Sequence, residues 1–121
     1  MDGPPRFRQL GQPLDAALKA RLRAVVAGRP VTESELRKLF EQGRACSLIM
    51  NGELEHSERR LAELSGDPAS SFVEIAAAVR RASSRREELD ELHALLAELT
   101  EHARAYRGAW VADVRGAAGV P

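Results

Sequence analysis

A chain of 121 residues is long enough for one folded domain and short of the length at which chains usually divide into two. Its 44% hydrophobic and 30% charged residues are not the composition of a disordered or a membrane-embedded protein. Eighteen basic and eighteen acidic residues give a formal net charge of zero, so the whole chain has no general attraction to nucleic acid.

The first 29 residues contain a flexible tail and a short predicted helix. Residues 1–12 are rich in Gly and Pro and are predicted to be a flexible N-terminal tail. A helix is predicted over residues 14–27, because Pro13 precedes it and Gly28 follows it. Its apolar side chains lie on one stripe, at Leu14, Leu18, Leu22, Val25 and Val26.

A second, longer helix is predicted over residues 33–65. Thr32 and Glu35 have the spacing of a capping box, in which the two side chains satisfy free backbone N–H groups at a helix start. Gly66 is the predicted stop. Gly52 lies in the middle, where glycine costs about 1 kcal/mol relative to alanine, so the sequence leaves the continuity of this helix open.

A third helix is predicted to follow a turn that contains Pro68. Ser71 and Glu74 form a second capping box, and the apolar spacing continues over residues 71–107 or as far as Val114. Residues 116–121 are predicted to be a flexible C-terminal tail. The helices together define a single helical domain over residues 13–115.

The two long patterns predict an antiparallel pairing of the second and third helices. Both carry apolar or small residues at alternating steps of three and four, as coiled-coil helices do. If Leu64 lies opposite Phe72, the same register places Ser47 opposite Leu89 and Met50 opposite Arg86. The expected fold is therefore all-α: a long, coiled-coil-like antiparallel helical hairpin with the short N-terminal helix packed at its open end, making a three-helix bundle.

Two apolar surfaces remain outside the predicted seam of the hairpin. A single short helix is not expected to cover both surfaces, and large uncovered apolar patches usually mark interfaces. The sequence thus predicts a protein partner, most simply a second copy in a homodimer. The candidate interface residues are Leu39, Cys46 and Ile49 on the second helix and Leu92, Leu95, Leu99, Tyr106 and Trp110 on the third.

Three histidines offer an alternative, metal-dependent function. His56, His93 and His102 each follow an acidic residue by three or four positions, a spacing that ferritin-like metal sites use. Acidic residues are frequent in this chain, so such pairs also arise by chance. The sequence predicts no catalytic residue, no cofactor, no bound metal and no small-molecule substrate.

A second alternative is a DNA-associated regulator. Residues 1–29 contain six basic and two acidic residues, which would suit a small basic arm or a solvated helix face. Arg80, Arg81 and Ser83 also fit a short basic-directed phosphorylation pattern, but the pattern is nonspecific and a solvated basic face is the favoured interpretation.

The single cysteine bears on the expected location of the protein. Because Cys46 has no second cysteine with which to pair, a reducing, cytoplasmic location is expected. No apolar stretch reaches the length of a membrane span. The leading hypothesis is therefore a non-enzymatic helical interaction protein, such as an adaptor, assembly factor or chaperone-like subunit.

Overall fold

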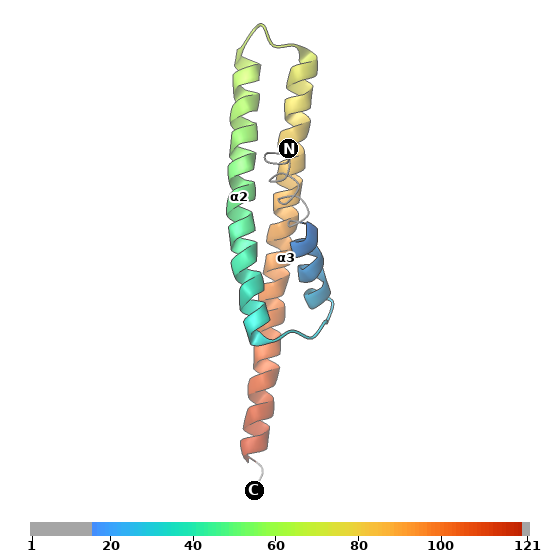
Figure 1. The fold of residues 1–121 in the computed structure, drawn as a ribbon, viewed down its shortest axis with the longest axis vertical. Helices are drawn as coiled ribbons and strands as arrows, with labels where there is room; N and C mark the ends of the chain where they lie inside the picture. Colours follow the sequence, from blue (N-terminus) through green and yellow to red (C-terminus); the bar gives the residue numbers. More distant parts are fainter. Residues whose placement is uncertain (1–15, 120–121) are drawn as a thin grey trace, which may run out of the picture. The chain divides into compact units, whose positions relative to one another are not determined.

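The computed structural model describes residues 16–119, except the side chains of residues 113 and 116–119. Three helices and no strand occur in this part of the chain, so the predicted all-α fold is confirmed (Figure 1). The helices are residues 16–26, α2 over Glu33–Gly66 and α3 over Phe72–Gly119. The predicted end of the first helix and both bounds of the second match these closely, whereas the predicted start of the first helix at residue 14 lies outside the described residues.

The predicted C-terminal boundary is wrong. The sequence predicts a flexible tail from residue 116 onward, but α3 continues to Gly119 and is 48 residues long. Alanine is the best helix former, and the Ala-rich composition of this end offsets the cost of its glycines. The rest of the predicted tails, residues 1–12 and 120–121, lies outside the described residues.

The chain folds as two compact units, and α2 and α3 contribute to both. The first unit combines residues 1–40 with 94–121, and we call it the bundle unit. The second unit consists of residues 41–93, and we call it the hairpin unit.

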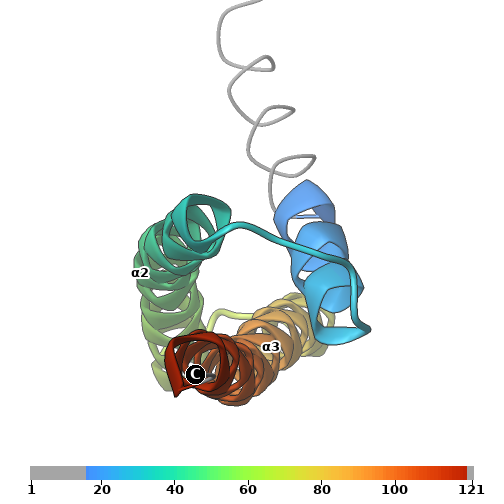
Figure 2. The ribbon, with the colours of Figure 1, turned by 90° about the horizontal axis from the view of Figure 1, so that it is seen from below.

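The bundle unit is a three-helix arrangement. Residues 16–26, the start of α2 and the later part of α3 surround a common core (Figure 2). Leu22, Leu36 and Leu99 are completely buried. The other buried apolar side chains of the unit are Leu18, Val25, Val31, Leu39, Leu95 and Ala103. Leucines at helical spacing thus bring the short N-terminal helix onto both long helices.

Gly28 ends the first helix in the way that the sequence predicts. Its φ of 113° lies in the left-handed region, which glycine adopts without steric cost. The N–H of Gly28 donates to the carbonyl of Val25, and the N–H of Arg29 donates to the carbonyl of Ala24, both at 3.0 Å. These two bonds form a Schellman motif, which satisfies carbonyls left free at the helix end.

The two predicted helix starts are also confirmed. The Glu35 N–H donates to Thr32 Oγ1 at 3.1 Å, and the Thr32 N–H donates to Glu35 Oε1 at 3.4 Å, which completes a capping box. At the start of α3, the Glu74 N–H donates to Ser71 Oγ at 3.1 Å. α2 is continuous through Gly52.

A compact turn joins α2 to α3 in the hairpin unit. The Ser70 N–H donates to the Asp67 carbonyl at 3.0 Å, and the Ala69 N–H donates to Asp67 Oδ1 at 2.9 Å. Asp and Pro at successive positions favour this kind of turn, because the Asp side chain bonds the backbone and Pro68 fixes its own φ. Gly66 is the last residue of α2 and does not adopt a positive φ, so it is not a left-handed cap.

The predicted register of the hairpin is wrong by about one helical turn. Ser47 Oγ and His93 Nε2 share a hydrogen bond of 2.8 Å, whereas the sequence pattern pairs Ser47 with Leu89. Arg86 bonds Glu58 instead of lying opposite Met50. Because His93 lies beside Ser47, the first residues of α3 extend past the end of α2 to the level of the connecting turn. Phe72 is therefore 90% exposed rather than packed on Leu64.

The core of the hairpin unit is narrower than that of the bundle unit. Met50, Leu54 and Leu64 are its buried apolar residues from α2, and α3 contributes Ala78, Ala82, Leu89 and Leu92. Two of the four α3 residues are alanines, which bury little area but allow two helices to approach closely. The ion pair between Arg85 Nη1 and Glu53 Oε1, at 3.2 Å, also links the two helices.

Candidate interaction surface

Four of the eight predicted interface residues are buried within the chain. Leu92 and Leu99 are fully buried, and Leu39 and Leu95 are 6% and 8% exposed. Leu39, Leu95 and Leu99 belong to the core of the bundle unit, where the short N-terminal helix contributes Leu18, Leu22 and Val25. Leu92 belongs to the core of the hairpin unit. The expectation that these four leucines remain uncovered is therefore wrong, because the short helix and the hairpin packing together cover more of the long helices than expected.

The predicted patch on α2 is reduced to Ile49. Cys46 is half-buried, with its Sγ 3.5 Å from Met50 Sδ. Ile49 is 65% exposed, and Leu48, which is not among the predicted interface residues, is 75% exposed. Adjacent residues diverge by about 100° around a helix, so these two side chains point in different directions and do not form one continuous stripe.

A continuous apolar stripe is exposed near the C-terminal end of α3, within the bundle unit. Trp110 is 62% exposed and Tyr106 is 39% exposed. Val111 and Val114, at 40% and 48%, extend the same surface. Tyr106, Trp110 and Val114 follow one another at steps of four and therefore lie along one face of the helix. We call these four residues the C-terminal stripe.

The C-terminal stripe continues a line that is buried earlier in the same helix. Leu95, Leu99 and Ala103 precede Tyr106 at helical spacing and are all buried. The change from buried to exposed occurs where α2 begins, as an ion pair between the two helices shows: Arg107 Nε donates to Glu33 Oε1 at 3.0 Å, and Arg107 Nη2 donates to the same oxygen at 2.6 Å. Beyond this level no described helix of the bundle unit lies beside α3 (Figure 1).

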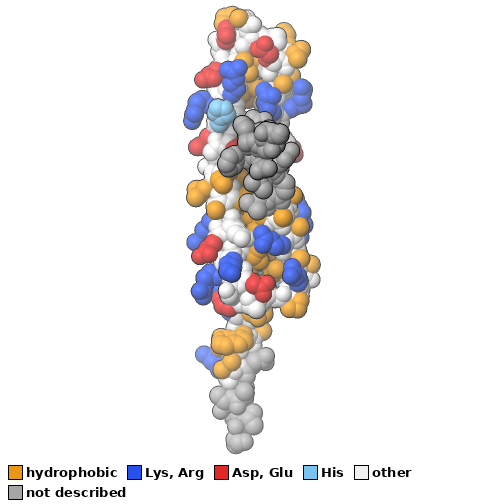
Figure 3. All heavy atoms as spheres, in the orientation of Figure 1, with side chains coloured by type: hydrophobic (Ala, Val, Ile, Leu, Met, Phe, Trp, Pro, Cys, Tyr) orange, Lys and Arg blue, Asp and Glu red, His pale blue; other side chains and the backbone are white. Residues whose placement is uncertain are grey.

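Val111 and Val114 are not among the predicted interface residues, although the spacing of Val114 in the sequence indicates that it lies on the same helix face as Trp110. Val114 lies four residues after Trp110 and eight after Tyr106, which is helical spacing. The sequence pattern leaves the end of the third helix open between residues 107 and 114, so it assigns residues beyond Trp110 to no face. Hydrophobic side chains are visible on this segment of α3 in Figure 3.

The ion pair between Glu33 and Arg107 shifts the pKa values of both side chains. Hydrogen bonds from the Arg107 guanidinium lower the pKa of the Glu33 carboxyl below its ordinary value, while desolvation acts in the opposite direction. The same hydrogen bonds raise the pKa of Arg107. Both groups are solvent-exposed, and the pair links the start of α2 to α3.

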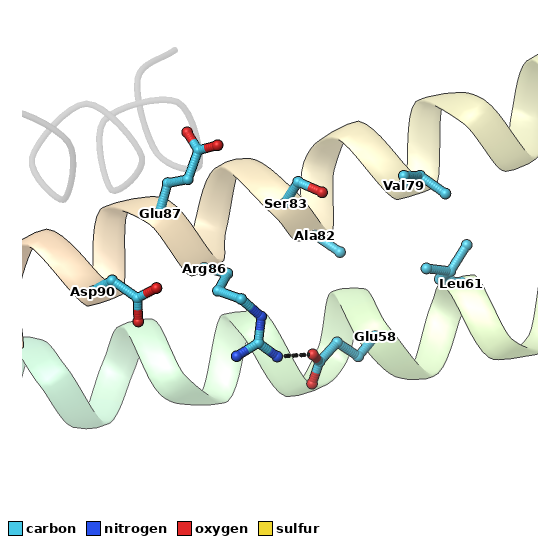
Figure 4. A pocket seen from close by; sticks show the side chains of 8 residues that line it. All are labelled: Glu58, Leu61, Val79, Ala82, Ser83, Arg86, Glu87 and Asp90. Atoms are coloured by element: carbon cyan, nitrogen blue, oxygen red, sulfur yellow. Dashed lines mark hydrogen bonds and ion pairs between the residues drawn. The ribbon is translucent and has the colours of Figure 1, made fainter.

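One groove of the hairpin unit has a volume of about 340 Å³. Leu61, Val79 and Ala82 supply its apolar side chains (Figure 4). Arg86 reaches from α3 to Glu58 on α2. The remaining lining residues are Ser83, Glu87 and Asp90. The lining thus combines apolar side chains of both helices with one arginine, one serine and three carboxylates.

The two alternative functions, a metal-dependent one and a DNA-associated one, depend on the histidines and on the basic first helix. No group of three or more potential metal ligands occurs among the described residues. His93 is hydrogen-bonded to Ser47, His56 is exposed and His102 is half-buried. In the first helix, Arg21 and Arg23 are exposed, whereas Lys19 is 7% exposed. Arg6 and Arg8 lie outside the described residues.

Comparisons with known proteins assign no family to this chain. No family model, no curated protein and no solved structure matches it. Among the described residues, no helix combines the length and the apolar character that crossing a bilayer requires. The exposed surfaces of the chain itself are therefore the observations on which a function can be argued.

Proposed function

We propose that this protein is a non-enzymatic helical interaction protein and that the C-terminal stripe is its contact surface. The observation that carries the proposal is the exposure of Tyr106, Trp110 and Val114 along one face of α3, with the exposed Val111 beside them. Tryptophan and tyrosine are enriched at protein interfaces, because they bury a large area and lose few degrees of freedom. A helix face of this kind is typically buried against another helix.

A second copy of the chain is the partner that we propose for this surface. In an antiparallel pair with a twofold axis at Trp110, Tyr106 lies opposite Val114 of the other copy and Trp110 meets its equivalent. Small residues beside the stripe, Ala105 and Ala109, allow the two helices to approach closely. One self-complementary patch is then sufficient for a closed dimer.

The charges near the stripe are compatible with this pairing. Arg104 Nη1 lies 3.2 Å from Glu101 Oε1, and Arg107 is held by Glu33. Since both arginines are paired with carboxylates of their own chain, the repulsion between two copies is reduced.

The size of the stripe predicts weak association. Aromatic residues bury at most about 150–250 Å² each, and stable interfaces need about 800 Å² from each partner. Four partly exposed side chains supply only a few hundred Å², so we expect a dimer that dissociates in the micromolar range.

Sedimentation velocity of wild type and two variants tests the proposal. Wild type should show a concentration-dependent shift from monomer to dimer. Trp110→Glu should remain monomeric, because a carboxylate at the centre of the contact would lose its hydration. The control is Ile49→Glu, which places the same charge on the equally exposed surface of α2 and should associate like wild type. A wild type that stays monomeric, or a dimer that Ile49→Glu disrupts and Trp110→Glu does not, contradicts the proposal.

A further inference from the structure

A second groove of the hairpin unit is lined by hydrogen-bond donors. It has a volume of about 130 Å³, and its lining residues are His56, Ser57, Arg60, Ala78, Arg81 and Arg85. Five of these six side chains can donate a hydrogen bond, and none is a carboxylate. The larger groove of the same unit has three carboxylates and one arginine. The two grooves therefore differ in the sign of the charge that they present.

The guanidinium groups of this groove are only partly occupied. Arg85 Nη1 lies 3.2 Å from Glu53 Oε1, and Arg60 Nη1 lies 3.6 Å from Glu63 Oε1. Arg81 forms no ion pair with a described residue. Each guanidinium carries five N–H donors, so the contacts of Arg60 and Arg85 leave most of their donors available. Exposed pairs of this kind contribute little stability and can be exchanged for another anion.

The geometry of the donors favours an anion with several oxygens. α2 supplies His56, Ser57 and Arg60, and α3 supplies Arg81 and Arg85, so the donors approach from two sides. A carboxylate offers two oxygens, whereas a phosphate group offers at least three, which can accept from several arginines together. The groove, at about 130 Å³, is large enough for a phosphate group.

We propose that this groove binds a phosphate group, with Arg81 and Arg85 of α3 and Arg60 of α2 as its principal donors. Ser57, which is half-buried and lines the groove, supplies a hydroxyl donor. Ala78 is buried beneath the site, and its short side chain leaves the space that the anion occupies. This binding does not depend on the C-terminal stripe, which lies in the other unit.

The protein offers a matched control for each half of the site. Arg80 is adjacent to Arg81 and Arg59 is adjacent to Arg60, but neither lines the groove. Removing Arg80 or Arg81 changes the net charge equally, so only a specific site distinguishes the two variants. The same reasoning applies to Arg59 and Arg60. All four arginines are exposed, and their substitution by glutamine leaves the core unchanged.

The test is a titration of ¹⁵N-labelled protein with inorganic phosphate, at an ionic strength held constant with sodium chloride. We expect saturable chemical-shift changes at residues 56, 57, 81 and 85, with a dissociation constant in the millimolar range. Arg81→Gln and Arg60→Gln should each weaken binding about tenfold, as expected for a lost charge-assisted hydrogen bond. Arg80→Gln and Arg59→Gln should leave the dissociation constant within about twofold of wild type.

Three results would overturn the proposal. Chemical-shift changes that increase linearly with phosphate concentration, without saturation, would show general screening of charges rather than binding at a site. Equal weakening by Arg80→Gln and Arg81→Gln would show a diffuse basic surface. Acetate that binds as tightly as phosphate would show that the number of oxygens is irrelevant.

Arg81→Lys, which keeps the charge and loses the planar fork, should bind phosphate less tightly than wild type.

Discussion

Among single residues, burial separates the apolar side chains of the core from those of the surface. Leu99 is fully buried in the bundle unit, whereas Leu48 is 75% exposed on α2. Both are leucines inside long helices, and leucine and alanine are both good helix formers. The two positions therefore differ mainly in the packing around the side chain.

Leu99→Ala should destabilise the protein by about 2–5 kcal/mol, because it removes buried methyl groups and leaves a cavity. Leu48→Ala should change the free energy of unfolding by less than about 0.5 kcal/mol. Urea denaturation of both variants measures the difference. Equal midpoints for the two would mean that Leu99 is not in the core.

The ion pair of Glu33 and Arg107 makes stability depend on pH. Because the pKa of Glu33 is lowered in the folded protein, its contribution is present above the ordinary glutamate pKa of about 4.3 and is lost as the pH falls through the lowered value. Wild type should therefore be more stable than Glu33→Gln at neutral pH, and the difference should vanish in acid.

Thermal unfolding between neutral pH and about pH 2 checks this prediction. Glu101→Gln is the control, since Glu101 pairs with its helical neighbour Arg104 and both side chains are more than 70% exposed. A stability difference between wild type and Glu33→Gln that persists unchanged in acid would contradict the proposed role of the carboxylate.

Among the helices, two glycines have opposite expected roles. Gly28 has a φ of 113°, whereas Gly52 lies within α2, and a Cβ added at either would meet no atom within 4 Å. Crowding is therefore absent at both positions, and only backbone conformation distinguishes them.

Gly28→Ala should destabilise the protein by about 1–2 kcal/mol, because an L-residue pays a steric cost in the left-handed region. Gly52→Ala should stabilise it by about 0.5–1 kcal/mol, because alanine is the better helix former. Chemical denaturation of the pair provides the measurement. A neutral Gly28→Ala variant would contradict the Schellman motif as the end of the first helix.

The sequence predicts helix starts and stops well, because these depend on neighbouring residues. Thr32 with Glu35, Ser71 with Glu74, and Gly28 each act within a few residues of their own position. The end of α3 is less predictable, because its Ala-rich and Gly-containing segment has no single stop signal.

The register and the surface depend on longer-range geometry, which the sequence pattern does not contain. With the turn at Asp67, α3 lies about one helical turn away from its expected position along α2. The sequence pattern does not exclude this register, because several registers of a repeating pattern are nearly equivalent. Burial of Leu39 and Leu95 depends on how the short N-terminal helix packs in the bundle unit. The sequence assigns Trp110 and Tyr106 to a candidate surface because they lie on an apolar line of the third helix that the predicted seam does not use.

For the protein as a whole, the main proposal is that the C-terminal stripe associates with a second copy. Trp110 is the single tryptophan of the chain, so its fluorescence reports on this surface alone. At 62% exposure the indole is hydrated in the monomer, and it would lose water in the proposed dimer.

The emission wavelength of Trp110, recorded as a function of protein concentration, follows this association at the contact itself. Self-association predicts a red-shifted emission in dilute solution that moves to shorter wavelength as the concentration rises through the micromolar range. Ile49→Glu should follow the same curve, whereas Val114→Glu should remain red-shifted, because Val114 lies in the proposed contact without being the reporter. An emission wavelength that does not change with concentration in wild type would contradict self-association through this surface.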